Sequence, residues 1–264
     1  MSAHSWRRRA AALSGAGVLA LTLLPVTSAS SDAEEPGPIH AGNTFGWYHD
    51  GVWRQEFKGA KPAYWHAKGR GSVRTQHGML TLNTTRRGSV SATLAKPGHA
   101  TGRWEIRLRA KRFESGRANY RVVSELVPAG ARDQHCGGRD VSLEGFRLGS
   151  DRAHFAIHTL PNNAFTAVKG RNLGNDRWHT WAVEVTRSHI SWFVDAHVVR
   201  TERRKAALSG VPLTVRFAME AVPGKAMNAS RMQMDWMRYW PARTPSKKSI
   251  AAPQTTQSTY AGAC

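Results

Sequence analysis

The sequence has little cysteine, little acid and a single long apolar run. Its two cysteines, Cys136 and Cys264, belong to no Cys-x-x-Cys pair, and no His-Glu-x-x-His motif is present, so no recognisable zinc site is encoded. Eighteen acidic residues stand against 38 basic ones, a net charge of +20. This excess predicts a polyanionic partner, unless it reflects only solubility and an arginine-rich composition. Because no nucleic-acid-binding motif accompanies it, nucleic acid is not expected as that partner.

The apolar run lies at the N-terminus and predicts export. Three arginines, Arg7 to Arg9, precede an uncharged stretch over residues 10–26, and small residues follow it. This is the order of parts in a secretory signal, and the adjacent arginines also suit a twin-arginine signal. Two glycines and a proline interrupt the run, which is shorter than the roughly 20 residues of a membrane span. Residues 1–29 are therefore predicted to be a signal peptide of the Sec or twin-arginine type. The mature protein is expected to be secreted, with no stable membrane insertion.

Composition divides the remaining chain into three parts. Residues 30–41 are rich in Ser, Asp, Glu and Pro and predict a linker. Residues 42–240 carry the apolar pattern of one folded domain, which we expect to be monomeric. Residues 241–264 are rich in Pro, Thr, Ser, Gln and Ala, and this composition predicts a disordered tail.

The folded part shows a period of two. Trp104, Ile106, Leu108 and Ala110 alternate with charged residues, and the same alternation recurs over residues 181–185, 213–219 and 232–236. Such alternation is typical of strands with one buried face and one wet face. Turn residues separate these strands, so the sequence predicts an all-β fold, a two-sheet β-sandwich.

Segments along this domain resemble, in order, those of glycoside hydrolase family 16, the laminarinase and lichenase-type β-glucanases. The resemblance implies a concanavalin A-like jelly roll with one concave face that holds a polysaccharide. It extends over about residues 45–240. The residues that carry it are Gln55–Phe57 with Trp65, Gly78–Leu82, Gly102–Lys111, Trp178–Val185 with Ile190–Asp195, and Met234–Tyr239.

The resemblance also assigns a catalytic strand. Family members place a nucleophile, a middle acid and an acid/base at alternate positions, so that all three face the substrate. Asp140, Ser142 and Glu144 stand at these positions here. Asp140 is thus the expected nucleophile and Glu144 the expected acid/base, while Ser142 replaces the middle acid and cannot tune its neighbours by charge.

Four further residues are predicted to bind substrate. Arg121 stands where the family usually places an aromatic platform, and Tyr120 precedes it. His158 matches a histidine that the family keeps near the acid. Trp65 lies in a loosely patterned region, where stacking on a sugar face is expected.

No cofactor is expected to be required, although the resemblance implies a structural calcium ion. Family members often hold this ion through a carboxylate of the closing strand and a backbone carbonyl. Asp235 matches that carboxylate. A single carboxylate predicts weak affinity, because calcium prefers six to eight oxygen ligands.

Three functions remain open at this point. The first is a secreted glycoside hydrolase that cleaves a β-glucan-like or acidic polysaccharide with retention of configuration. The second is a non-catalytic, lectin-like protein of the cell wall or matrix. The third is a polysaccharide lyase acting on acidic substrates. Against all of them stands the alternative that Asp140 and Glu144 are ordinary solvated strand residues.

The two cysteines give a testable prediction. In an oxidising compartment, Cys136 and Cys264 are expected to form a disulfide between a loop and the tail. Ellman titration of the native secreted protein should therefore find no free thiol until reductant is added, and two thiols afterwards. Two free thiols before reduction would contradict the disulfide.

Overall fold

A computed structural model describes residues 39–130, 141–243 and 247–260, which form two antiparallel sheets packed face to face. The predicted β-sandwich is confirmed. Sheet A follows the order β13 (His197–Glu202), β12 (Ile190–Val194), β11 (His179–Val185), β6 (Gly102–Arg112), β15 (Ser230–Trp240), β4 (Met79–Thr84) and β3 (Gly71–Gln76), with β1 (Trp53–Gln55) paired to β15.

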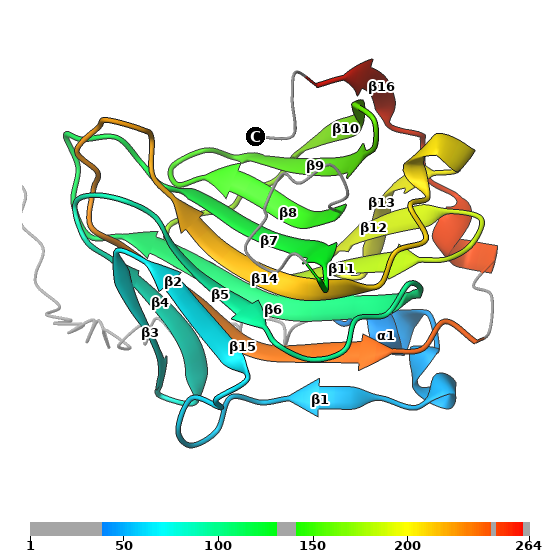
Figure 1. Ribbon diagram of the computed structural model, residues 1–264, viewed down its shortest axis with the longest axis horizontal. Coiled ribbons are helices and arrows are strands. Elements are labelled where there is room, and N and C mark those ends of the chain that lie inside the picture. Colours follow the sequence, from blue (N-terminus) through cyan, green and yellow to red (C-terminus); the bar gives the residue numbers. More distant parts are fainter. Residues whose placement is uncertain (1–38, 131–140, 244–246, 261–264) are drawn as a thin grey trace, which may run out of the picture. The chain divides into compact units, whose positions relative to one another are not determined.

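Sheet B forms the other layer. Figure 1 shows its strands β7 and β14 above β6 and β15 of sheet A. Its order is β16 (Thr256–Thr259), β10 (Asn163–Gly170), β9 (Arg152–Thr159), β8 (Val141–Arg147), β7 (Arg121–Pro128), β14 (Leu213–Glu220), β5 (Val90–Leu94) and β2 (Trp65–Gly69). The short helical elements are α1 (Ala41–Thr44) and the 3-10 turns η1 (Trp47–Asp50), η2 (Lys205–Ala207) and η3 (Lys247–Ile250).

The alternating apolar residues fill the space between the sheets, as the sequence predicts. Trp104, Ile106 and Leu108 of β6 and Phe217 of β14 are all at most 2 % exposed and belong to one continuous core. Burial of one such side chain stabilises the fold by about 1.5–3 kcal/mol. The core therefore fixes which face of each strand remains for other contacts.

The outer face of sheet A is itself partly buried, which the alternation does not predict. The segment that begins at α1 packs a second apolar cluster, with Trp47 and Trp240 in it, onto this face. Glu105 lies beneath the segment and accepts hydrogen bonds from the amides of Ala41 (2.6 Å) and Gly42 (3.2 Å). Burial raises the pKa of Glu105 to about 7, although these two amides act in the opposite direction.

The prediction that residues 241–264 are disordered is wrong for the part of this tail that the structure describes. Strand β16 pairs antiparallel with β10, and the amide of Thr201 bonds to the Pro253 carbonyl at 3.0 Å. Composition missed this because the attachment uses backbone hydrogen bonds and polar side chains rather than apolar burial.

A buried ion pair anchors the same tail. The Glu202 carboxylate, whose side chain is 0 % exposed, binds Arg204 at 2.5 Å, and Arg204 also donates to the Thr255 carbonyl at 2.5 Å. Burial acts to raise the pKa of Glu202, but the hydrogen bonds from Arg204 and Thr255 outweigh it and hold the pKa below its ordinary value. One carboxylate thus joins β13 to the tail.

Removing Arg204 should therefore destabilise the domain. We expect Arg204→Gln to lower the free energy of unfolding by about 1–3 kcal/mol, because it leaves the buried Glu202 carboxylate short of partners. Lys205→Gln removes the same charge from an exposed neighbouring residue and serves as the control. The urea midpoints of the two variants measure the difference, and equal midpoints would contradict this role of the pair.

Candidate functional site

Strand β8, the expected catalytic strand, carries a β-bulge. Against β7, Val141 and Ser142 pair with Leu126 and Glu125, but Glu144 pairs with Ser124, so Leu143 is an extra residue. Against β9 the register also shifts between Val141 and Gly145. A bulge of this kind places one more residue on its strand than the partner strand has.

The bulge turns Glu144 toward the core. Its partner Ser124 stands between Val122 and Leu126, which both belong to the core between the sheets. Glu144 is 0 % exposed. The expectation that Ser142 and Glu144 share one face is therefore wrong, because the extra residue between them breaks the alternation. Asp140 lies outside the described residues.

The Glu144 carboxyl is enclosed. Its Oε1 accepts a hydrogen bond from the Ser124 hydroxyl at 2.6 Å, whereas Oε2 is buried without a hydrogen-bond partner within the described ranges. Burial raises the pKa of Glu144 to about 8, and the Ser124 hydrogen bond and the charge of Arg121 only partly oppose this shift. Glu144 is thus a neutral, buried acid at pH 7 in this structure.

Ser142 accepts two hydrogen bonds that stabilise the bulge. Its hydroxyl accepts from the Ala156 amide at 2.6 Å, and its carbonyl accepts from the Trp192 indole of sheet A at 2.6 Å. Ser142 is 4 % exposed. The residue predicted to touch substrate thus has a structural role in this structure.

Gly145 takes the outward position that Glu144 was expected to hold, and Arg121 covers it. A Cβ atom built on Gly145 would lie 3.0 Å from the Arg121 Nη2 atom. Arg121 stands on β7, half exposed, with its Nη1 atom 3.7 Å from the Glu220 carboxylate. At this point of sheet B, a guanidinium group stands where a carboxylate was expected.

An ion-pair network that the sequence reading missed continues across the outer face of sheet B. The Arg216 Nη1 atom binds the Glu125 carboxylate and lies 3.5 Å from Glu220 Oε1. Arg216 and Glu125 are register partners on β14 and β7. The alternation of apolar and polar residues in the sequence places each of them on the outward face of its strand. The pairing of β7 with β14, which brings the two together, is a tertiary feature that the alternation does not predict.

A cavity of about 520 Å³ opens beside Arg121. Arg147, His154 and His158 line it together with Thr166. Burial lowers the pKa of His154, and the charges of Arg121 and Arg152 add to this effect. His158, predicted to bind substrate, does border the cavity, and its ring lies 4.6 Å from that of Tyr260.

Trp65 and Tyr120 lie in the core, which corrects the expectation that they contact substrate. Trp65 is 0 % exposed and stacks on Phe217 with ring centroids 5.4 Å apart. Tyr120 is also fully buried, and its hydroxyl donates to the carbonyls of Thr85 (2.8 Å) and Gly88 (2.9 Å). A sugar cannot reach either ring.

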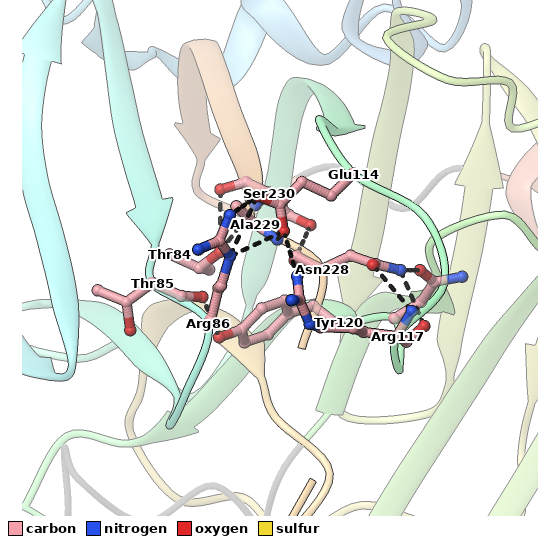
Figure 2. Close-up of polar contacts among 10 residues, drawn as sticks. Thr84, Thr85, Arg86, Glu114, Arg117, Tyr120, Asn228, Ala229 and Ser230 are labelled. Carbon is pink, nitrogen blue, oxygen red and sulfur yellow. Dashed lines mark hydrogen bonds and ion pairs between the residues drawn. The ribbon is translucent and has the colours of Figure 1, made fainter. Parts of the chain in front are cut away.

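Figure 2 shows a polar network of loop residues beside Tyr120. Around it, Glu114 binds Arg86 and Arg117, and the Asn228 side chain bonds to the Arg117 backbone, so three loops are tied together. The Arg86 hydrogen bond is the largest influence on Glu114 and lowers its pKa to about 2. The tyrosine joins this loop assembly to the core.

Asp235 does not fit the calcium site that the resemblance implies. Its carboxylate binds the Arg107 guanidinium at 2.6 Å, at the bulge between Met234 and Trp236. Within residues 39–130, 141–243 and 247–260, no group of three His, Cys, Asp or Glu side chains is placed to hold a metal ion. A cation beside Asp235 would compete with a guanidinium group already bound there.

Comparison with known proteins identifies the fold but not by sequence. The sequence matches no protein-family model and no curated protein. Solved structures do match: a laminarinase from Rhodothermus marinus is 15 % identical with a TM-score of 0.57, over 72 % of this chain and 96 % of its own. The fold is that of the laminarinases.

Two further structures agree. The laminarinase catalytic domain of Thermotoga maritima is 10 % identical, with a TM-score of 0.59 over 73 % of this chain and 98 % of its own. The endo-β-1,3(4)-glucanase SCLam, described as a member of family GH16, is 14 % identical, with a TM-score of 0.56 over 72 % and 90 %. The resemblance to glycoside hydrolase family 16 is thus confirmed for the laminarinase-like jelly roll.

Among the residues that the structure describes, no helix is long and apolar enough to cross a membrane.

The buried acid gives a prediction about stability and pH. Glu144 has a pKa of about 8 in the fold against an ordinary value of 4.5, so unfolding between these pH values releases its proton and stability falls as the pH rises from about 4.5 to 8. We expect Glu144→Gln to be about 2–4 kcal/mol more stable than the native protein at pH 8 and little different at pH 4.5.

Urea unfolding at both pH values measures this difference. Glu56→Gln, which removes a carboxyl group from the loop after β1, serves as the control. A Glu144 variant that is destabilised equally at both pH values would contradict the buried, neutral state.

Proposed function

We propose that the protein is exported and binds an acidic polysaccharide on the outer face of sheet B. The observation that carries this proposal is the position of Arg121. Its guanidinium group fills the space of an outward side chain at Gly145, where a carboxylate was expected. Arginine recognises carboxylate and sulfate groups through paired hydrogen bonds. The face therefore favours a ligand that carries negative charge.

The surroundings of Arg121 support this choice. Arg147 is its register partner on β8 and lines the same cavity, while Arg152 on β9 is exposed nearby. The Glu125 and Glu220 carboxylates are both engaged by Arg216, so they offset Arg121 only in part. The cavity of about 520 Å³ is within the usual size of a site that holds a small ligand or a few sugar units.

Hydrolysis is the second candidate. Both Glu125 and Glu220 lie within ion-pair distance of one Arg216 nitrogen, so their carboxylates are close together on the outer face. Retaining glycosidases place their two carboxyl groups about 5–5.5 Å apart. The structural neighbours include enzymes named as laminarinases and glucanases. In this alternative, Glu125 and Glu220 take the two carboxyl roles that the sequence predicts for Asp140 and Glu144.

Affinity electrophoresis tests the binding proposal. The native protein should be retarded by polygalacturonate and by dextran sulfate but not by neutral laminarin. Arg121→Gln combined with Arg147→Gln should weaken retardation roughly three- to tenfold, since exposed ion pairs contribute little individually. Lys58→Gln combined with Arg70→Gln removes two exposed charges elsewhere as the matched control.

The outcomes separate the two candidates. Equal retardation by neutral and acidic polymers, or equal loss in the control, would contradict acidic-glycan binding. Reducing-sugar assays on the same polymers address hydrolysis. Release that disappears in Glu125→Gln or Glu220→Gln would favour catalysis, whereas retardation without release would leave binding as the function.

A further inference from the structure

The outer face of sheet A carries an ordered polar surface that the proposed site does not use. Its residues stand in two rows that run straight across neighbouring strands in register. We call this surface the sheet A rows. The first row is Arg74 of β3, Thr81 of β4, Gln233 of β15 and Arg109 of β6, and the second is Ser72, Asn83, Arg231 and Lys111.

The two rows have an excess of positive charge. Arg109, Lys111 and Arg231 all reach one carboxylate, that of Asp176, at 3.4 Å. Arg74 is exposed, and the structure gives it no ion pair within the described residues. Three cations thus share a single carboxylate and Arg74 adds a fourth positive charge, so the surface keeps a capacity for further anions.

Packing fixes Arg109, at the end of the first row, in place. The guanidinium carbon of Arg109 lies 4.5 Å from the Trp178 ring centroid, and that of Arg107 lies 4.4 Å from it. The Arg109 Nε atom donates to Gln233 at 3.1 Å, and Gln233 donates to Thr81 at 3.3 Å. A cation held by an aromatic ring and by hydrogen bonds loses little freedom when a ligand binds.

The spacing suits an extended polymer. Neighbouring strands lie about 4.8 Å apart, so each row spans roughly 14 Å across the four strands. In the first row, Arg74 and Arg109 stand at the ends, while Thr81 and Gln233 between them are buried and bond to each other. In the second row, the exposed Ser72 and the partly buried Asn83 stand beside Arg231 and Lys111, so polar groups that can hydrogen-bond to sugar hydroxyls lie next to cations. An arrangement of this kind matches a chain that repeats both hydroxyl and anionic groups.

We infer that the sheet A rows are a second binding surface for an acidic polysaccharide, with carboxylate or sulfate groups bound at Arg74, Lys111 and Arg231. This surface lies on the opposite side of the sandwich from Arg121, because the outer faces of the two sheets point away from each other. A single molecule with both surfaces bridges two polymer chains. Such bridging raises the apparent affinity for a polymer above that of either surface alone.

Three matched triple variants test this inference. The first replaces Arg74, Lys111 and Arg231 with Gln, the second replaces Arg121, Arg147 and Arg152, and the control replaces Lys58, Arg70 and Lys205. Thermal melts establish that each variant is folded. Affinity electrophoresis then measures binding to polygalacturonate, dextran sulfate, laminarin and DNA, and light scattering measures cross-linking of each acidic polysaccharide.

We expect the Arg74/Lys111/Arg231 variant to bind acidic polymers roughly three- to tenfold more weakly and to lose cross-linking, while the control keeps both. Polygalacturonate and dextran sulfate distinguish carboxylate from sulfate recognition. Sedimentation of the free protein excludes cross-linking by protein dimers. Stronger retardation by DNA than by either acidic glycan would overturn the assignment to polysaccharide.

The results of the three variants distinguish a failure of this inference from a failure of the proposed function. Unchanged affinity and cross-linking in the Arg74/Lys111/Arg231 variant overturn the second surface alone. Unchanged affinity in the Arg121/Arg147/Arg152 variant, with loss in the other, overturns the sheet B site and leaves the second surface standing. Loss in neither variant overturns both.

Discussion

The β-bulge at Leu143 is the constraint on which the character of the outer face of sheet B depends. It inserts one residue into β8, which turns Glu144 inward to Ser124 and Gly145 outward to Arg121. The distortion is supported on both sides, because the Ser142 hydroxyl bonds to Ala156 and its carbonyl to Trp192. A bulge with its freed groups satisfied is a stable feature of a sheet rather than a defect.

Much of the fold follows from the sequence, because the core depends on alternation that is visible residue by residue. Trp104 and Ile106 face inward since the period of two places them there, and a one-residue slip would expose them. The site was less predictable. The extra residue leaves only a small trace in the sequence, because the buried apolar residues shift from positions 141 and 143 to positions 146 and 148. The pairing with β7 and β9 is needed to identify Leu143 as the extra residue. The predictions of an exposed Trp65 and of a disordered tail over residues 241–264 are wrong for a related reason. Composition does not reveal which contacts bury an aromatic ring or hold a polar strand.

The positive surface is also a consequence of how the fold uses its acids. Glu105, Glu125, Glu144, Glu184 and Glu202 are each at most 1 % exposed. Glu184 pairs with Arg103 at 2.5 Å and with His189 at 2.8 Å inside the protein. Acids enclosed in this way neutralise a few internal cations and contribute little to the potential outside. The surface is therefore more positive than an even distribution of the net charge of +20 would make it.

This division of charge connects the two proposed surfaces. On sheet B, Arg216 binds Glu125 and Glu220, which leaves Arg121 and Arg147 beside the cavity. On sheet A, one carboxylate, that of Asp176, serves three cations. On both outer faces, positively charged side chains thus outnumber the carboxylates that pair with them. A laminarinase-like sandwich of this kind is suited to hold an anionic polymer, because each layer presents a rigid strand surface whose charges are already positioned before the ligand arrives.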